Sequence, residues 1–247
     1  MPFKPSASRR AALHLILAGL LSACAPGPVR PPPVPVGETP ADFQEAHYRR
    51  AQALGQPVWR INPQDSLISV TVRRGGTLAR LGHDHIIASR NINGFVAPEQ
   101  GRADFHFRLD QLSVDEPALR TEAGLAPQPS SDAILGTRRN MLSKALDAQR
   151  FPFVLIHVTR VAPGAALKAV VTLNGVSRSM DIAAQIEPYG DGIAVSGRMN
   201  LLQSDFGIVP FSVLGGAIAI SDRLDLRFRI LADGRANFEN CSACQIK

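Results

Sequence analysis

Two histidines flank one aspartate in the stretch 79–89, ARLGHDHIIAS. Imidazole nitrogens and carboxylates are ligands that zinc and related ions accept. On a strand, His83 and His85 would share one face while Asp84 points to the other. Two imidazoles form only part of a zinc site, which takes at least a third protein ligand. A hydrogen-bonded polar cluster after Gly82 is the simpler interpretation, and a metal site is the alternative.

The other histidines do not complete such a site from the sequence alone. His106 falls on the polar face of a predicted strand, opposite Phe105 and Phe107, and His157 shares a face with Leu155. A third interpretation is a contact with the headgroup of a ligand, which requires the 79–89 stretch and a later helical segment to meet at one end of the fold. The residues that would make this contact are Arg80, His83, His85, Arg138 and Arg139.

The sequence carries no pattern typical of an enzyme. Serine-nucleophile motifs, phosphate-binding loops and paired general-acid carboxylates are absent, so we predict no catalytic residues and no required cofactor. The net charge is +6, and no basic run is interleaved with aromatic residues. The absence of such a run gives no case for nucleic acid as a partner.

The first 23 residues have the features of an export signal. Lys4, Arg9 and Arg10 form a basic region, and the apolar run 11–21 is too short to span a bilayer. Leu21-Ser22-Ala23-Cys24 is similar to a bacterial lipobox, in which the cysteine thiol is lipidated and becomes the first residue. Removing residues 1–23 leaves 24 basic and 21 acidic residues, a net charge of about +3.

We therefore expect an acyl anchor, such as palmitate, on Cys24. Ala25 follows this cysteine in place of aspartate, which by similarity to Gram-negative lipoproteins favours the periplasmic face of the outer membrane. Seven of the 17 residues 24–40 are proline, typical of a stiff polyproline-like spacer. At about 3.1 Å per residue it would reach on the order of 45 Å. A short helix over 41–54 completes the segment 24–56, and the sequence leaves open whether it packs on the domain.

Alternating apolar and polar residues dominate the predicted domain, residues 57–233. Strands are expected at 66–72, 104–110, 154–161, 167–173, 179–186, 193–200 and 223–230. Asn174-Gly175 and Asp191-Gly192 are hairpin signals between such runs. One polar face on nearly every strand indicates an antiparallel sheet, and closing it removes the exposed edges. We predict an all-β fold, an eight-stranded antiparallel lipocalin-like barrel.

One segment interrupts this pattern. Apolar residues in 130–150 recur at helical spacing, and Ser131 or Asp132 is the expected N-cap. The preceding stretch 116–130 is predicted as a loop. We expect the helix to lie across one open end of the barrel.

The chain resembles the YceI-like family from about Trp59 to Ala232. The resemblance rests on the order and spacing of short motifs: Trp59-Arg60-Ile61 with Ser66, Gly82-His83, Arg150-Phe151-Pro152-Phe153, Leu173-Asn174-Gly175-Val176-Ser177-Arg178, and Ser204-Asp205-Phe206-Gly207-Ile208. It implies a lipocalin-like barrel with an apolar tunnel that binds an isoprenoid or another long-chain lipid, without catalysis. The predicted tunnel lining comprises Ile68, Val70, Phe105, Phe107, Ile156, Ile182, Leu226 and Phe228.

The resulting functional prediction is a membrane-anchored periplasmic lipid binder or carrier. The alternative is a periplasmic protein that binds a metal ion through His83 and His85. The C-terminal tail 234–247 contains Cys241 and Cys244 in a C-x-x-C arrangement. In an oxidising periplasm, a small disulfide loop is the expected state of these two cysteines, and half of a zinc site or an intermolecular bridge are the alternatives. The sequence gives no indication of an oligomer.

Overall fold

The computed structural model describes residues 39–125, 127–162 and 164–234. The predicted signal peptide, Cys24, most of the spacer, and Cys241 with Cys244 lie outside the described residues. Thirteen strands and three α-helices form the described part. The strands are β1 Trp59–Ile61, β2 Leu67–Gly75, β3 His85–Ser89, β4 Asn93–Ala97, β5 Arg102–Arg108, β6 Ser113–Val114, β7 Phe153–Arg160, β8 Leu167–Leu173, β9 Val176–Ile182, β10 Ala184–Tyr189, β11 Gly192–Leu202, β12 Ser212–Val213 and β13 Ile218–Asp233.

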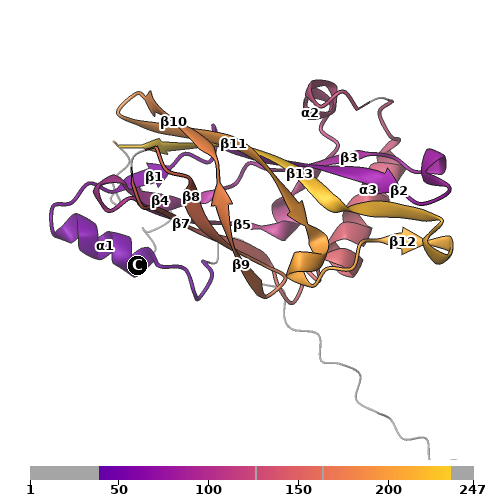
Figure 1. The fold of residues 1–247 in the computed structure, drawn as a ribbon, viewed down its shortest axis with the longest axis horizontal. Helices are drawn as coiled ribbons and strands as arrows, with labels where there is room; N and C mark the ends of the chain where they lie inside the picture. The colour runs from indigo at the N-terminus through magenta and orange to yellow at the C-terminus, as the bar shows by residue number, and fades with distance from the viewer. Residues whose placement is uncertain (1–38, 126, 163, 235–247) are drawn as a thin grey trace, which may run out of the picture. The chain divides into compact units, whose positions relative to one another are not determined.

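Twelve of these strands combine into eight long antiparallel runs (Figure 1). β1 and β2 follow one another along the same edge of β13, with β4 and β3 beside them and β5 and β6 beside those. β7 and β8 continue the sheet, and β9 passes directly into β10 after a single residue, Ala183. β10 pairs with β11 and β11 pairs with β13, so the circuit closes. The structure confirms the predicted all-β barrel class. Interruptions within four runs, together with the short β12, account for the count of thirteen strands instead of eight.

Of the two predicted hairpin turns, one is present as predicted and the other is shifted by one residue. Asn174 and Gly175 both have positive φ, 52° and 72°, as the predicted two-residue turn requires. The Asp191-Gly192 turn is wrong by one position, because the turn is formed by Gly190 and Asp191 and β11 begins at Gly192. A Cβ atom at Gly192 would lie 1.8 Å from the carbonyl oxygen of Ala232 on β13. This glycine therefore serves the close approach of two strands.

The helical insertion is present as α3, Ser131–Asn140, followed by a π-helical turn, η4, Met141–Ala145. The predicted N-cap was wrong, since the Ser130 side chain accepts the hydrogen bond from the Ala133 backbone at 3.2 Å. Ser131 is already inside the helix. The stretch predicted as a loop also contains a helix, α2, Pro117–Glu122, which starts at a proline because its fixed φ suits the first helical turn.

Helix α1, Glu45–Ala53, packs on the outside of the barrel wall beside β4, which settles the role that the sequence left open (Figure 1). Tyr48 and Ala51 are buried in a cluster with Val58 and Ala97. No helix within the described ranges is long and apolar enough to cross a membrane.

Candidate functional site

A cavity of about 580 Å³ lies within the barrel. Its walls are mostly apolar side chains that alternate with outward-facing residues along each strand. The eight residues predicted to line a tunnel all line this cavity: Ile68, Val70, Phe105, Phe107, Ile156, Ile182, Leu226 and Phe228. Their contact with a ligand stays a prediction.

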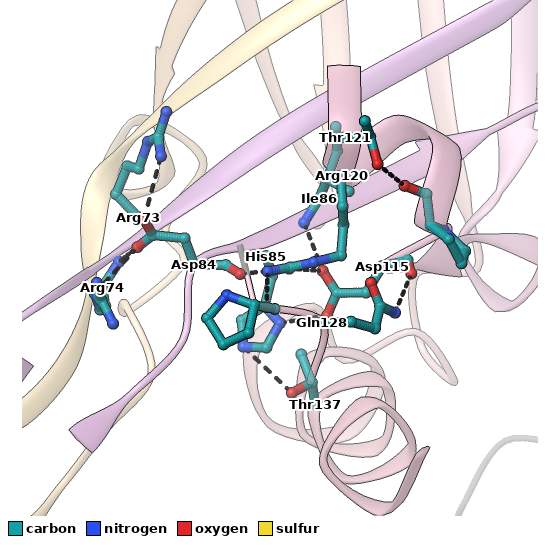
Figure 2. A network of polar contacts seen from close by, with 12 residues as sticks. Arg73, Arg74, Asp84, His85, Ile86, Asp115, Arg120, Thr121, Gln128 and Thr137 are labelled. Atoms are coloured by element: carbon teal, nitrogen blue, oxygen red, sulfur yellow. Dashed lines mark hydrogen bonds and ion pairs between the residues drawn. The ribbon is translucent and has the colours of Figure 1, made fainter. Parts of the chain in front are cut away.

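The polar residues at one end of the cavity come from three elements. His83 and His85 precede and begin β3, Arg74 lies near the end of β2, and Thr137 and Asn140 come from α3. We call these five residues the histidine end. Figure 2 shows α3 beneath His85, so the helix lies across this part of the barrel as the sequence predicted.

His85 is held by a buried carboxylate. Its Nδ1 lies 2.6 Å from Oδ2 of Asp115, whose side chain has no exposed surface (Figure 2). A carboxylate only accepts hydrogen bonds, so Nδ1 carries the proton that it donates. Nε2 lies on the opposite side of the ring, 3.5 Å from Oγ1 of Thr137. The imidazole therefore presents Nε2 toward the cavity.

Asp115 is itself fixed by two other donors. The Arg120 guanidinium donates to its Oδ1 at 2.6 Å, and the backbone N–H of Ile86 donates to the same oxygen at 3.1 Å. Burial alone would raise the pKa of Asp115, but the hydrogen bonds from His85, Ile86 and Arg120 outweigh it and lower that pKa. Because its pKa is lowered, the Asp115 carboxylate is ionised at neutral pH. The Asp115 backbone adopts a positive φ of 57°.

Asp84 points away from the two histidines, as strand alternation predicts, although β3 begins only at His85. Its oxygens accept from the Arg74 backbone at 2.9 Å and from the Arg73 guanidinium at 3.2 Å. The rings of His83 and His85 have their centroids 6.1 Å apart. Within the part of the chain that the structure describes, no three His, Cys, Asp or Glu residues are grouped to hold a metal ion.

The predicted headgroup residues divide into two groups. His83 and His85 line the cavity, whereas Arg80, Arg138 and Arg139 are not among its lining residues. Arg138 instead donates to the backbone carbonyls of Asp110 and Leu112. Arg74 is the cation that the structure places at the histidine end.

Sequence reasoning also missed Asp115, Arg120 and Thr137. Asp115 lies 30 positions from His85, and no local pattern connects them. Thr137 could have been found, because it continues the helical stripe between Ile134 and Met141 that faces the barrel.

A second histidine–carboxylate pair lies outside the cavity. Nδ1 of His157 is 2.6 Å from Oδ1 of Asp104, whose other oxygen accepts from Tyr48 on α1 at 2.5 Å and from Arg102 at 2.8 Å. Burial opposes ionisation of Asp104, but these donors lower its pKa. The pair ties α1 to the barrel wall, and His157 does not line the cavity.

Comparison with known proteins gives a family match. The model of the YceI-like domain matches residues 59–232. No curated protein matches the chain.

Among solved structures, a polyisoprenoid binding domain from Saccharophagus degradans, implicated in plant cell wall breakdown, is similar with a TM-score of 0.51 and 11% identity, covering 71% of this chain and 98% of that one. BcnA of Burkholderia cenocepacia is similar with a TM-score of 0.49 and 12% identity over 70% of this chain and 99% of its own. A YceI protein of Campylobacter jejuni is similar with a TM-score of 0.38 and 13% identity, covering 55% of this chain and 73% of that one. At 11% identity, the first of these supports the fold alone.

Proposed function

This chain belongs to the YceI-like family, and on that basis we propose that it binds a lipid, whose hydrocarbon chain occupies the barrel cavity. The observation that supports this most directly is the apolar cavity of about 580 Å³, a size typical of pockets that enclose a small molecule. An isoprenoid or another long-chain lipid suits its mostly hydrocarbon walls. The Saccharophagus degradans domain, described as polyisoprenoid binding, has the same fold.

Burial of apolar carbon would drive binding. Each square ångström of apolar surface removed from water contributes roughly 25 cal/mol, offset by the loss of translational and conformational freedom of the lipid. Such binding needs no bond-making step, so the protein acts as a carrier or a sequestering protein without catalysis.

The same proposal places the protein at a membrane. Lipidation of Cys24 would anchor the chain at the periplasmic face of the outer membrane, and the proline-rich spacer would hold the barrel away from the surface. The partners are thus a lipid ligand and the membrane that carries the acyl anchor. No three His, Cys, Asp or Glu residues among the described residues are grouped to hold a metal ion, so we do not extend the metal-binding alternative.

A pair of adjacent residues on β8 provides the test. Val171 lines the cavity, whereas Val170 is on the opposite face of the same strand. Val171→Trp fills part of the cavity, and Val170→Trp adds the same side chain outside it. The full-length chain and both variants are purified in the same detergent, and the lipids that they retain are quantified by mass spectrometry after denaturation.

We expect a lipid at near-stoichiometric occupancy in the wild type and in Val170→Trp, and a loss of roughly fivefold in Val171→Trp, because the larger side chain obstructs the space that the hydrocarbon chain would occupy. Thermal unfolding establishes that both variants fold. Equal lipid content in the two folded variants would show that the lipid is bound outside the cavity. No specific lipid in the wild type would contradict the proposed function.

A further inference from the structure

The histidine end of the cavity has a fixed arrangement of hydrogen-bonding atoms. The Asp115 carboxylate accepts a hydrogen bond from the protonated Nδ1 of His85, and Nε2 is the ring nitrogen that faces the cavity. The His85 side chain is 12% exposed. The only partner of Nε2 among the described residues is the Thr137 hydroxyl at 3.5 Å, the outer limit of a hydrogen bond.

The charges of the network are already balanced when His85 is neutral. Asp115 provides one negative charge, and Arg120, which cannot lose its proton in a protein, provides one positive charge against it at 2.6 Å. Arg120 also donates to the carbonyl oxygens of Asp84 and Pro127, both at 2.8 Å, so its position is fixed from three sides. With the Nδ1 proton directed at Asp115, the neutral ring presents the lone pair of Nε2 to the cavity, where it can accept a hydrogen bond.

From this geometry we infer that the histidine end selects a lipid with a hydroxyl head, an alcohol or a phenol, whose O–H donates to Nε2 of His85. A hydroxyl both donates and accepts. The same ligand oxygen can therefore accept from the hydroxyl of Thr137, which lies across the gap from Nε2. This inference rests on the proposed function, because it assigns the head of the lipid whose chain fills the barrel.

Other head chemistries fit this end less well. A carboxylate or phosphate would bring negative charge to a lone pair. The cation of the histidine end, Arg74, donates to the Gly82 carbonyl at 2.9 Å and lies 3.7 Å from the Asp84 carboxylate. An ether or a hydrocarbon would have no proton to donate, and Nε2 would lose water without gaining a partner.

The test uses three probes with one chain: geranylgeraniol, its methyl ether and geranylgeranoic acid. Their affinities for the detergent-solubilised full-length protein at pH 7.5 are measured by calorimetry. His85→Asn keeps an N–H donor toward Asp115 and removes Nε2. His157→Asn is the matched control, because His157 has the same 2.6 Å contact to a carboxylate but lies outside the cavity.

We expect the wild type and His157→Asn to bind the alcohol about tenfold more tightly than the ether, the effect of one buried hydrogen bond. His85→Asn should bind both probes with the affinity of the ether, and Thr137→Val should lower the preference for the alcohol. Unchanged unfolding temperatures exclude loss of fold as the cause.

Three results would overturn the inference. Equal affinities for alcohol and ether in the wild type, both abolished by Val171→Trp, would leave the lipid-binding function intact and remove the hydroxyl preference. Tighter binding of the acid would show that the histidine end recognises an anion. Failure of all three probes to bind would remove the proposed function together with the inference.

Discussion

Arg120 and Asp115 form an ion pair at 2.6 Å with side chains that are 4% and 0% exposed. Two such buried charges are stable only together, because either one alone would lie in a medium that solvates it poorly. The pair joins α2 to β3 and fixes the position of His85.

Removing the negative charge should therefore destabilise the protein strongly. We expect Asp115→Asn to lower the free energy of unfolding by about 3–5 kcal/mol, measured by urea denaturation at pH 7. The exposed pair of Asp181 and Lys168 gives the comparison, and Asp181→Asn should cost less than about 1 kcal/mol. Equal effects of the two substitutions would show that Arg120 reaches water when Asp115 is neutral.

His106 should make stability depend on pH above the range of the carboxyl groups. Burial lowers its pKa to about 4, and the rings of Phe43 and Phe153 pack against it. In the unfolded chain the pKa is about 6.5, so between these values the unfolded state binds more protons and stability falls as the pH falls. Unfolding free energies at pH 7.5, 6, 5 and 4.5 should decline by a total on the order of 3 kcal/mol. In His106→Leu this part of the slope should disappear, and an unchanged slope would assign it to other groups.

The hydroxyl of Tyr48 should stabilise the docking of α1. It donates to buried Asp104 at 2.5 Å, and burial followed by the nearby carboxylate raises the pKa of this phenol, which stays protonated. Tyr48→Phe should cost about 1.5–3 kcal/mol, the range for a hydrogen bond to a charged group. Tyr189, 47% exposed, is the control, and Tyr189→Phe should change stability by less than about 0.5 kcal/mol. Thermal melts of both variants would show the contrast, and similar melting temperatures would argue against it.

Two glycines should respond to alanine in opposite directions. Gly136 lies within α3, and a Cβ there would meet nothing within 4 Å, so Gly136→Ala should stabilise the protein by about 0.5–1 kcal/mol. Gly192→Ala would place a methyl group on the Ala232 carbonyl and should destabilise by more than about 2 kcal/mol. Denaturant titration should give a midpoint above the wild type for Gly136→Ala and below it for Gly192→Ala. Midpoints shifted in the same direction would contradict the prediction.

Lipidation should depend on one cysteine. When cells expressing the chain are fed labelled palmitate, the wild type should incorporate label and Cys24→Ala should not. Cys241→Ala should remain labelled and provides the control. Label on Cys24→Ala, or none on the wild type, would show that the chain is not anchored in this way.

The sequence predicted what depends on local pattern. Alternation located β8 to the residue and most of the other long strands, and it identified which side of β5 carries Phe105 and Phe107. It missed β3 and β4, and it joined β9 and β10 into one strand over 179–186. It also placed His106 on the outer face, but could not show that Phe43 covers it. The contact between Phe43 and His106 joins segments more than 60 positions apart, and no local pattern in either segment predicts it.

The histidine end also combines a local pattern, which the sequence predicted, with contacts between distant segments, which it did not. The sequence placed His83 and His85 on one side of Asp84 without revealing what holds them. Asp115 follows the two-residue strand β6 with a positive φ, directly before the stretch 116–130 that the sequence analysis predicted as a loop. The spacer, the acyl anchor and the cysteine tail stay predictions, since they lie outside the described residues.

The packing of α1 has a mechanical consequence. The described chain begins at residue 39 with Pro40 buried, packs Phe43 against His106, and then runs along the outer wall through Tyr48. Tension applied from the N-terminal side would act on Pro40 and Phe43 before it reached Tyr48. The strands around the cavity would bear force only after the helix had come away. Detachment of α1 would therefore precede any distortion of the cavity.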